Sequence, residues 1–143
     1  MMPNGKAEPL SESSAAPGPH GWILAVGALL AAAGVALGAF GAHALGDTLG
    51  EREMGWWQTA VHYQMWHALA LVAIAALPMQ RTGLPAASLA IGAGLFSGTL
   101  YVMALTGLRW LGMITPIGGA LMIAGWLLLA WRGFFTRRSS DRS

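Results

Sequence analysis

Two histidines, a tyrosine and a glutamine interrupt an otherwise apolar stretch of the sequence, Ala60–Leu71 (AVHYQMWHALAL). Imidazole titrates near neutral pH and is the commonest metal ligand, so His62 and His67 could carry protons or bind a ligand. The same polar groups could instead join helices through hydrogen bonds, each worth about 0.6–2 kcal/mol in a membrane. Both roles are open at this point, and we favour the structural one.

Metal, haem and enzymatic chemistry find little support in the residues present. His62 and His67 are five residues apart, about 140° around a helix, whereas two histidines on one helix usually share a metal at a spacing of four. His43 could add a ligand from a neighbouring helix, but the expected spans contain no carboxylate or thiol. Ser97 could meet a histidine, yet the acid that orients a catalytic histidine would have to come from a loop. We therefore expect no metal, no cofactor and no enzymatic activity.

The composition is typical of an integral membrane protein. Of the 143 residues, 55% are apolar and only 10% are charged, and the mean hydropathy is +0.55. These values are too apolar for an ordinary soluble domain of this size. The cationic residues gather at the C-terminus and not in a patch interleaved with aromatic residues, so we expect no binding of nucleic acid. The absence of cysteine excludes disulfides, iron–sulfur clusters and thiol catalysis.

Four apolar segments are long enough to cross a bilayer: about residues 22–40, 57–77, 85–105 and 113–131. Each approaches the roughly 20 residues that cross about 30 Å of hydrocarbon as a helix. Because lipid offers no hydrogen bonds to the backbone, the expected fold class is all-α, an integral membrane four-helix bundle over residues 21–132. Pro85 and Pro116 fit the first turns of the third and fourth helices, and Thr115 could cap the fourth.

The ends of the chain and its loops predict an orientation. Residues 1–20 are rich in Pro, Ser, Gly and Ala, which predicts a disordered tail, and residues 133–143 form a basic tail. With four spans both tails share one side with the loop at residues 78–84. That side holds most of the cationic residues: Lys6, Arg81, Arg132, Arg137, Arg138 and Arg142. The positive-inside rule therefore predicts a multi-pass protein of the inner (plasma) membrane with both termini in the cytoplasm.

The first connection, residues 41–55 (GAHALGDTLGEREMG), carries most of the acidic residues. It could form a short interfacial helix, with Leu45 and Leu49 one turn apart on one side, or a solvated loop. Ala42–Ala44 (AHA) resembles a signal-peptide cleavage site. The apolar run before it is longer than the usual core of about 7–15 residues, so we expect no cleavage.

Polar side chains concentrate in the half of the expected bundle that is nearer the extracytoplasmic surface of the membrane. At 100° per residue, the second segment has its polar and aromatic residues on one side and Val61, Met65 and Ala68 on the other. We expect the first side to face the bundle and the second to face lipid. The candidate polar cluster comprises His43, His62, Tyr63, Gln64, His67, Ser97, Tyr101 and Thr115.

Small residues predict which helix faces pack closely. Gly34 and Gly38 are four residues apart in the first segment, as are Gly94 and Gly98 in the third, and Gly118 lies in the fourth. In lipid, helix association depends on small residues that let two backbones approach. We expect the glycine faces of the first and third segments to point into the bundle, although the pattern does not distinguish this from homodimerisation.

Four stretches match, in order, the motifs of a known family: GAFGAHAL (38–45), TAVHYQMWHALAL (59–71), LFSGTLYVMALTG (95–107) and LGMITPIGGALMIAGW (111–126). They resemble the small membrane proteins related to transmembrane protein 256, the YgdD-like family, over about residues 21–132. The resemblance implies a four-helix inner-membrane protein, bacterial or mitochondrial, with no established activity. The long polar N-terminal segment departs from the compact family pattern. The family motifs map onto His43, Tyr63, Gln64, His67, Ser97, Gly98, Tyr101, Thr115, Pro116 and Gly118.

Two kinds of function follow from these observations. The first is a structural or accessory membrane component without chemistry of its own, whose partners are the lipid bilayer and either further copies of the chain or a larger membrane complex. The second is a carrier or small-ligand binder that uses the polar cluster with its histidines. A hydrated cavity lined by the cluster would favour the second function, and a dry seam of hydrogen bonds would favour the first.

Overall fold

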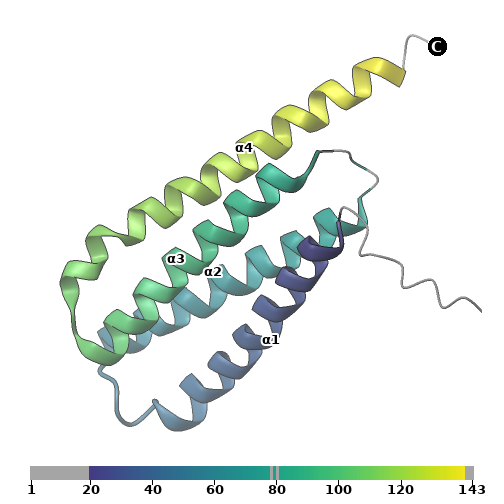
Figure 1. Cartoon of the computed structure of the whole chain (residues 1–143). Helices are drawn as coiled ribbons and strands as arrows, with labels where there is room; N and C mark the ends of the chain where they lie inside the picture. Colours follow the sequence, from purple (N-terminus) through teal and green to yellow (C-terminus); the bar gives the residue numbers. More distant parts are fainter. Residues whose placement is uncertain (1–19, 78, 80, 141–143) are drawn as a thin grey trace, which may run out of the picture.

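The computed structural model describes residues 20–77, 79 and 81–140, with side chains through residue 135. Most of the predicted N-terminal tail therefore lies outside the described residues. The described chain is all-α (Figure 1). Its elements are α1 (Gly21–Ala44), α2 (Glu51–Ala76), α3 (Gly83–Thr106), the short 3-10 helix η1 (Arg109–Met113) and α4 (Thr115–Ser140).

The four long helices pack side by side in chain order. α1 packs on α2, α2 on α3, and α3 on α4, while α1 and α3 also touch. The start of α1, the α2–α3 connection and the end of α4 lie at one end of the molecule (Figure 1). The α1–α2 turn and η1 lie at the other end. The all-α four-helix arrangement predicted from the sequence is confirmed.

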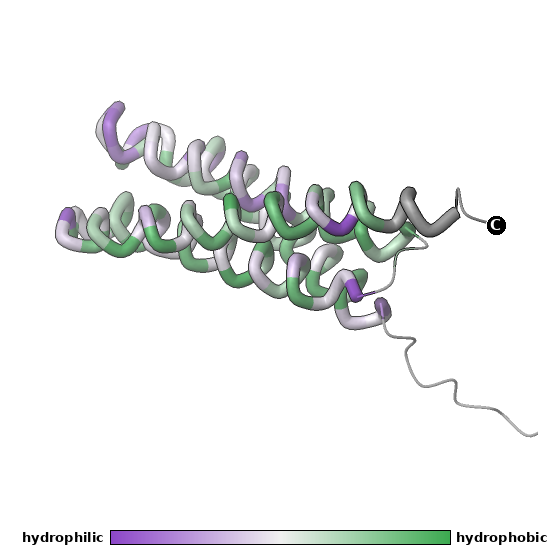
Figure 2. The backbone as a smooth tube through the Cα atoms, turned by 90° about the horizontal axis from the view of Figure 1, so that it is seen from above, coloured by the Kyte–Doolittle hydropathy of each residue, from purple (hydrophilic) through white to green (hydrophobic). Residues whose placement is uncertain are grey.

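Three of the described helical segments are long and apolar enough to cross a membrane: α1, α3, and the segment Arg109–Phe135 that joins η1 to α4. α1 alone has 24 residues, which correspond to about 36 Å at 1.5 Å per residue. α2 is as long but less apolar, because it carries the glutamines and histidines of the predicted cluster. Apolar residues run along most of the helix length in Figure 2.

The α1–α2 connection is shorter than expected. α1 continues to Ala44 and α2 begins at Glu51, so only residues 45–50 join them. No separate interfacial helix forms within residues 41–55, and the solvated loop is confined to this short turn, where residues 46–48 and 50 are exposed. The early start of α2 has an electrostatic reason, since Glu51 and Glu53 lie in its first turn, where the positive end of the helix dipole favours carboxylates.

Other helix ends follow local sequence signals. Pro85 and Pro116 lie in the first turns of α3 and α4, where a missing N–H costs nothing. The sequence suggested that Thr115 could cap α4. It is instead the first residue of that helix. Gly107 caps the C-terminus of α3, and its φ of 70° lies in the left-handed region that favours glycine. α4 continues to Ser140, well beyond the predicted end of the fourth span.

The α3–α4 interface depends on two glycines that face each other. A Cβ atom added to Gly118 would lie 2.6 Å from the backbone nitrogen of Phe96, and one added to Gly92 would lie 2.8 Å from the carbonyl oxygen of Gly118. Neither position leaves room for a side chain without moving a backbone. These contacts bring the backbones of α3 and α4 directly against each other.

The predicted glycine faces of α1 and α3 differ in their surroundings. Gly34 and Gly38 face α2, where added Cβ atoms would meet Met65 and Val61 at 3.2 and 3.4 Å. Gly94 and Gly98 have nothing within 4 Å of such an atom among the described residues. The expectation that they point into the bundle is wrong, because α3 packs on α2 and α4 through other sides of the helix.

We expect Gly118→Ala to destabilise the protein by about 1–3 kcal/mol, because the added methyl group overpacks a backbone contact. Gly94→Ala is the matched control, and its methyl group meets no neighbour within the described chain. The free energy of unfolding is measured by SDS titration in mixed micelles, followed by circular dichroism. Equal losses for the two variants would contradict the packing described here.

Candidate functional site

The polar residues of α2 lie on two sides of the helix. Gln64 and His67 are buried, with 5% and 6% of their surface exposed, and Tyr63 is half-buried. His62 and Trp66 face outward and stack on each other with ring centroids 5.9 Å apart. The expectation that the whole polar and aromatic side faces the bundle is therefore wrong for His62 and Trp66.

The physical reason is that the closest helix contacts of α2 use small residues. Ala68, which we had expected to face lipid, is fully buried. A Cβ atom added to Gly27 of α1 would lie 3.0 Å from the carbonyl oxygen of Ala68. Because alanine permits this approach, α1 covers the side of α2 that the amphipathic pattern assigned to lipid. α2 is therefore rotated about its axis relative to that prediction.

Gln64 joins three helices through its side-chain amide. Its Nε2 donates a hydrogen bond to the carbonyl oxygen of Leu30 in α1 at 2.8 Å. The hydroxyl of Tyr101 in α3 donates to its Oε1 at 3.0 Å. The ring of Tyr101 in turn packs edge-on against Trp57 at a centroid distance of 4.6 Å. Both ends of the amide are therefore paired within the bundle.

His67 is held in one tautomer by its two partners. Its Nδ1 lies 2.7 Å from the carbonyl oxygen of Tyr63, which can only accept a hydrogen bond, so Nδ1 carries the proton. The indole N–H of Trp126 in α4 donates to Nε2 at 3.2 Å, so Nε2 must be unprotonated. The imidazole is therefore neutral with both nitrogens engaged, and it connects α2 to α4.

The hydroxyl groups of α3 pair with the helices on either side. Ser97 donates to the carbonyl oxygen of Ala60 in α2 at 2.9 Å. The hydroxyls of Thr99 and Thr115 lie 2.9 Å apart and join α3 to the start of α4. We call the interhelical hydrogen bonds of this region the polar seam. Its side chains belong to Trp57, Gln64, His67, Ser97, Thr99, Tyr101, Thr115 and Trp126.

The seam brings together only part of the predicted cluster. Gln64, His67, Ser97, Tyr101 and Thr115 belong to it, whereas the carbonyl oxygen of Tyr63 accepts from His67 within α2. His43 and His62 do not, because both are exposed on the outside of the bundle.

Sequence reasoning missed the two indoles of the seam. Trp57 donates to the carbonyl oxygen of Leu37 at 3.0 Å, although it begins the second apolar segment, where an indole would be expected at the membrane interface. Trp126 lies within the fourth predicted span, where an indole N–H needs a hydrogen-bond acceptor. That rule would have pointed to a partner on a neighbouring helix, but not to which one. Ser88, outside the seam, also joins α3 to α4 by donating to the carbonyl oxygen of Leu121 at 2.7 Å.

The chemistry available to the seam is limited by how fully it is paired. Among the side chains that the structure describes, no buried nitrogen or oxygen atom lacks a hydrogen-bond partner. Within residues 20–77, 79 and 81–140, no three His, Cys, Asp or Glu side chains lie close enough together to hold a metal ion. Each buried polar side-chain atom of the described seam therefore has at least one partner within the bundle, and the arrangement joins helices.

The apolar helices and the paired seam define a small all-helical membrane protein. A model of the family described as "Protein of unknown function (DUF423)" matches residues 37–119. The chain is 46% identical to the UPF0382 inner membrane protein YgdD of Escherichia coli (strain K12) over 99 residues, which are 66% of this chain and 76% of that protein. The chain belongs to this family of membrane proteins of unknown function.

Relatives from other bacteria match a larger part of the chain. A UPF0382 membrane protein of Staphylococcus haemolyticus is 44% identical over 114 residues, covering 75% of this chain and 90% of the relative. One from Staphylococcus saprophyticus is 42% identical over 114 residues, covering 75% and 92%. The family predicted from the sequence motifs is confirmed. No solved structure shows a significant match.

We expect Trp126→Phe to lower the free energy of unfolding by about 0.6–1.7 kcal/mol, because it removes a hydrogen bond between helices but keeps an aromatic ring. Trp110→Phe is the control, since Trp110 is 55% exposed. Unfolding in mixed micelles measures both variants. A double-mutant cycle with His67→Phe should assign the loss to this pair, and additive effects would show that the bond contributes nothing.

Proposed function

We propose that this protein is a structural or accessory component of the cell inner membrane, without catalytic chemistry of its own. The observation that carries the proposal is the complete pairing of the polar seam. A carrier or an enzyme needs polar groups that are free to meet a substrate, whereas those of the seam already bind neighbouring helices. Pairing of this kind stabilises a bundle in lipid, where water is absent.

Association with other membrane proteins is part of the proposal. The outward face of α3 around Gly94 and Gly98 has no Cβ neighbours within the described chain, and Ile91 beside it is 61% exposed. Small residues on an exposed helix face allow a second helix to approach closely. We therefore propose that the chain works as a homo-oligomer or inside a larger membrane complex.

Native mass spectrometry of the protein extracted in mild detergent tests this function. We expect an oligomer or a co-purifying protein subunit, without a stoichiometric metal or haem. Gly98→Leu should release the bound subunit, because the larger side chain blocks the approach of a helix, whereas Ile91→Leu on the same face should not. A monomer that carries a stoichiometric metal or haem would overturn the proposal.

We also propose that all four long helices cross the membrane, with both ends of the chain in the cytoplasm. The length of α2, 26 residues, and its position between α1 and α3 support a fourth span despite its lower apolarity. Hydrogen bonds within the seam reduce the free-energy cost of placing the buried polar side chains of α2 in a membrane. The end of the bundle that holds both ends of the helical chain also carries Arg81 and Arg132, consistent with the positive-inside rule.

Single cysteines test this orientation, because the natural chain has none. In right-side-out membrane vesicles we expect a membrane-impermeant maleimide to label Thr48→Cys, in the α1–α2 turn, and to leave Ser139→Cys unlabelled. Inverted vesicles should give the opposite result, and detergent should expose both sites. Labelling of both variants in the same intact vesicles would contradict an arrangement with four spans.

A further inference from the structure

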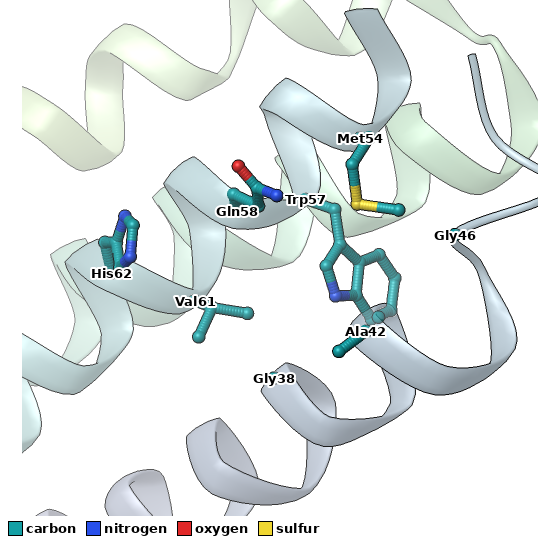
Figure 3. A pocket seen from close by; sticks show the side chains of 9 residues that line it. Gly38, Ala42, Gly46, Met54, Trp57, Gln58, Val61 and His62 are labelled. Atoms are coloured by element: carbon teal, nitrogen blue, oxygen red, sulfur yellow. The ribbon is translucent and has the colours of Figure 1, made fainter. Parts of the chain in front are cut away.

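A groove runs between α1 and α2 beside the turn that joins them (Figure 3). Its volume is about 590 Å³, within the usual range of about 300–1,000 Å³ for ligand sites. Trp57 and Val61 point from α2 toward α1 within it (Figure 3). The residues that line the groove are Gly38, Gly41, Ala42, Gly46, Met54, Trp57, Gln58, Val61 and His62.

Small residues on α1 create the groove. Gly38, Gly41 and Ala42 present almost no side chain to α2, so the wall of α1 is nearly bare backbone. The indole of Trp57 is fixed by its hydrogen bond to Leu37 and by the ring of Phe40, whose centroid lies 6.0 Å away. The apolar part of the groove is therefore preformed, with a shape that suits a flexible hydrocarbon chain.

Two polar side chains that line the groove make no hydrogen bond within the part of the chain that the structure describes. Gln58 and His62 lie on consecutive turns of α2 and are exposed. Neither makes a hydrogen bond to any residue that the structure describes, in contrast to Gln64 and His67 of the seam. Both side chains carry N–H donors, and one helical turn separates them by about 5.4 Å. Their N–H donors suit a ligand with two acceptor oxygens at a similar spacing.

The charged residues between the lining residues Gly46 and Met54 restrict the head group of such a ligand. Asp47, Glu51 and Glu53 lie in or beside the α1–α2 turn, together with a single cation, Arg52. Three carboxylates beside one guanidinium repel a head group with net negative charge and attract an ammonium group. The guanidinium of Arg52 can still donate hydrogen bonds to a phosphate. The charge pattern therefore matches a zwitterionic head group that bears an amine.

We propose that the groove binds one diacyl phospholipid with an amine-bearing zwitterionic head group. An acyl chain lies along Val61 and the bare wall of α1, and the two ester carbonyls accept hydrogen bonds from Gln58 and His62. The ammonium group lies among the carboxylates of the turn. This site shares no hydrogen bond with those that Gln64 and His67 make. It also does not depend on which side of the membrane the α1–α2 turn lies.

Native mass spectrometry of delipidated full-length protein, titrated with defined lipids, tests the site. We expect one molecule of palmitoyl-oleoyl phosphatidylethanolamine to bind at least about tenfold more tightly than phosphatidylglycerol with the same chains. Gln58→Leu combined with His62→Leu should weaken binding of the first lipid about tenfold, and Gly38→Leu should abolish it by filling the groove. His43→Leu is the matched control, since His43 is an exposed histidine near the turn that does not line the groove.

The removal of charge gives a separate measurement. Replacing Asp47, Glu51 and Glu53 by their amides should remove most of the preference for phosphatidylethanolamine while leaving one bound lipid. Circular dichroism checks that each variant is folded, and the exposed positions of Gln58 and His62 keep their double variant informative if Gly38→Leu fails to fold. Equal binding of the two lipids by the natural protein, or unchanged binding in the Gln58 and His62 double variant, would overturn the proposal. Either result would leave the role in association and the four-span topology untouched.

Discussion

The interaction on which the bundle depends is the pair of hydrogen bonds made by the side chain of Gln64. In the middle of a membrane an unpaired amide costs several kcal/mol, about as much as the whole margin of stability of a small domain. Leu30 accepts from one end of this amide and Tyr101 donates to the other. Because both partners lie on different helices, the amide is satisfied only when α1, α2 and α3 are all in place. A polar group that is costly alone thereby specifies how the helices must meet.

The same constraint explains why polar residues collect on α2. It packs against both α1 and α3 and reaches α4 through His67, so partners are available on several sides. α1, α3 and α4 are more apolar and offer backbone carbonyl groups or single hydroxyls as partners. The pairing of His67 with a carbonyl oxygen on one side and an indole on the other defines a neutral ring. A protonated His67 would place two N–H groups opposite each other and lose its connection to α4.

The sequence predicted features that depend on length and local chemistry. The four long helices, the prolines in their first turns and the family all follow from runs of residues that are visible in order. The rotation of α2 did not follow, because it depends on which surface of α1 permits the closest approach. Ala68 appeared to be a lipid-facing residue only because the pattern ranks side chains by polarity and not by size. Gly94 shows the converse, since a small residue permits close packing without requiring it.

A single helix thus carries two sets of polar residues under opposite conditions. Gln64 and His67 are buried and hydrogen-bonded, while Gln58 and His62 are exposed and make no hydrogen bond among the described residues. Internal pairing explains why the first set is tolerated in a membrane but offers no reason for the second. On a helix that crosses a bilayer, exposed polar side chains either reach the head-group layer or hydrogen-bond to a molecule beside the helix, because hydrocarbon offers them nothing. The groove on the outside of α2, next to α1, therefore suits a ligand better than the hydrogen-bonded interior of the bundle does.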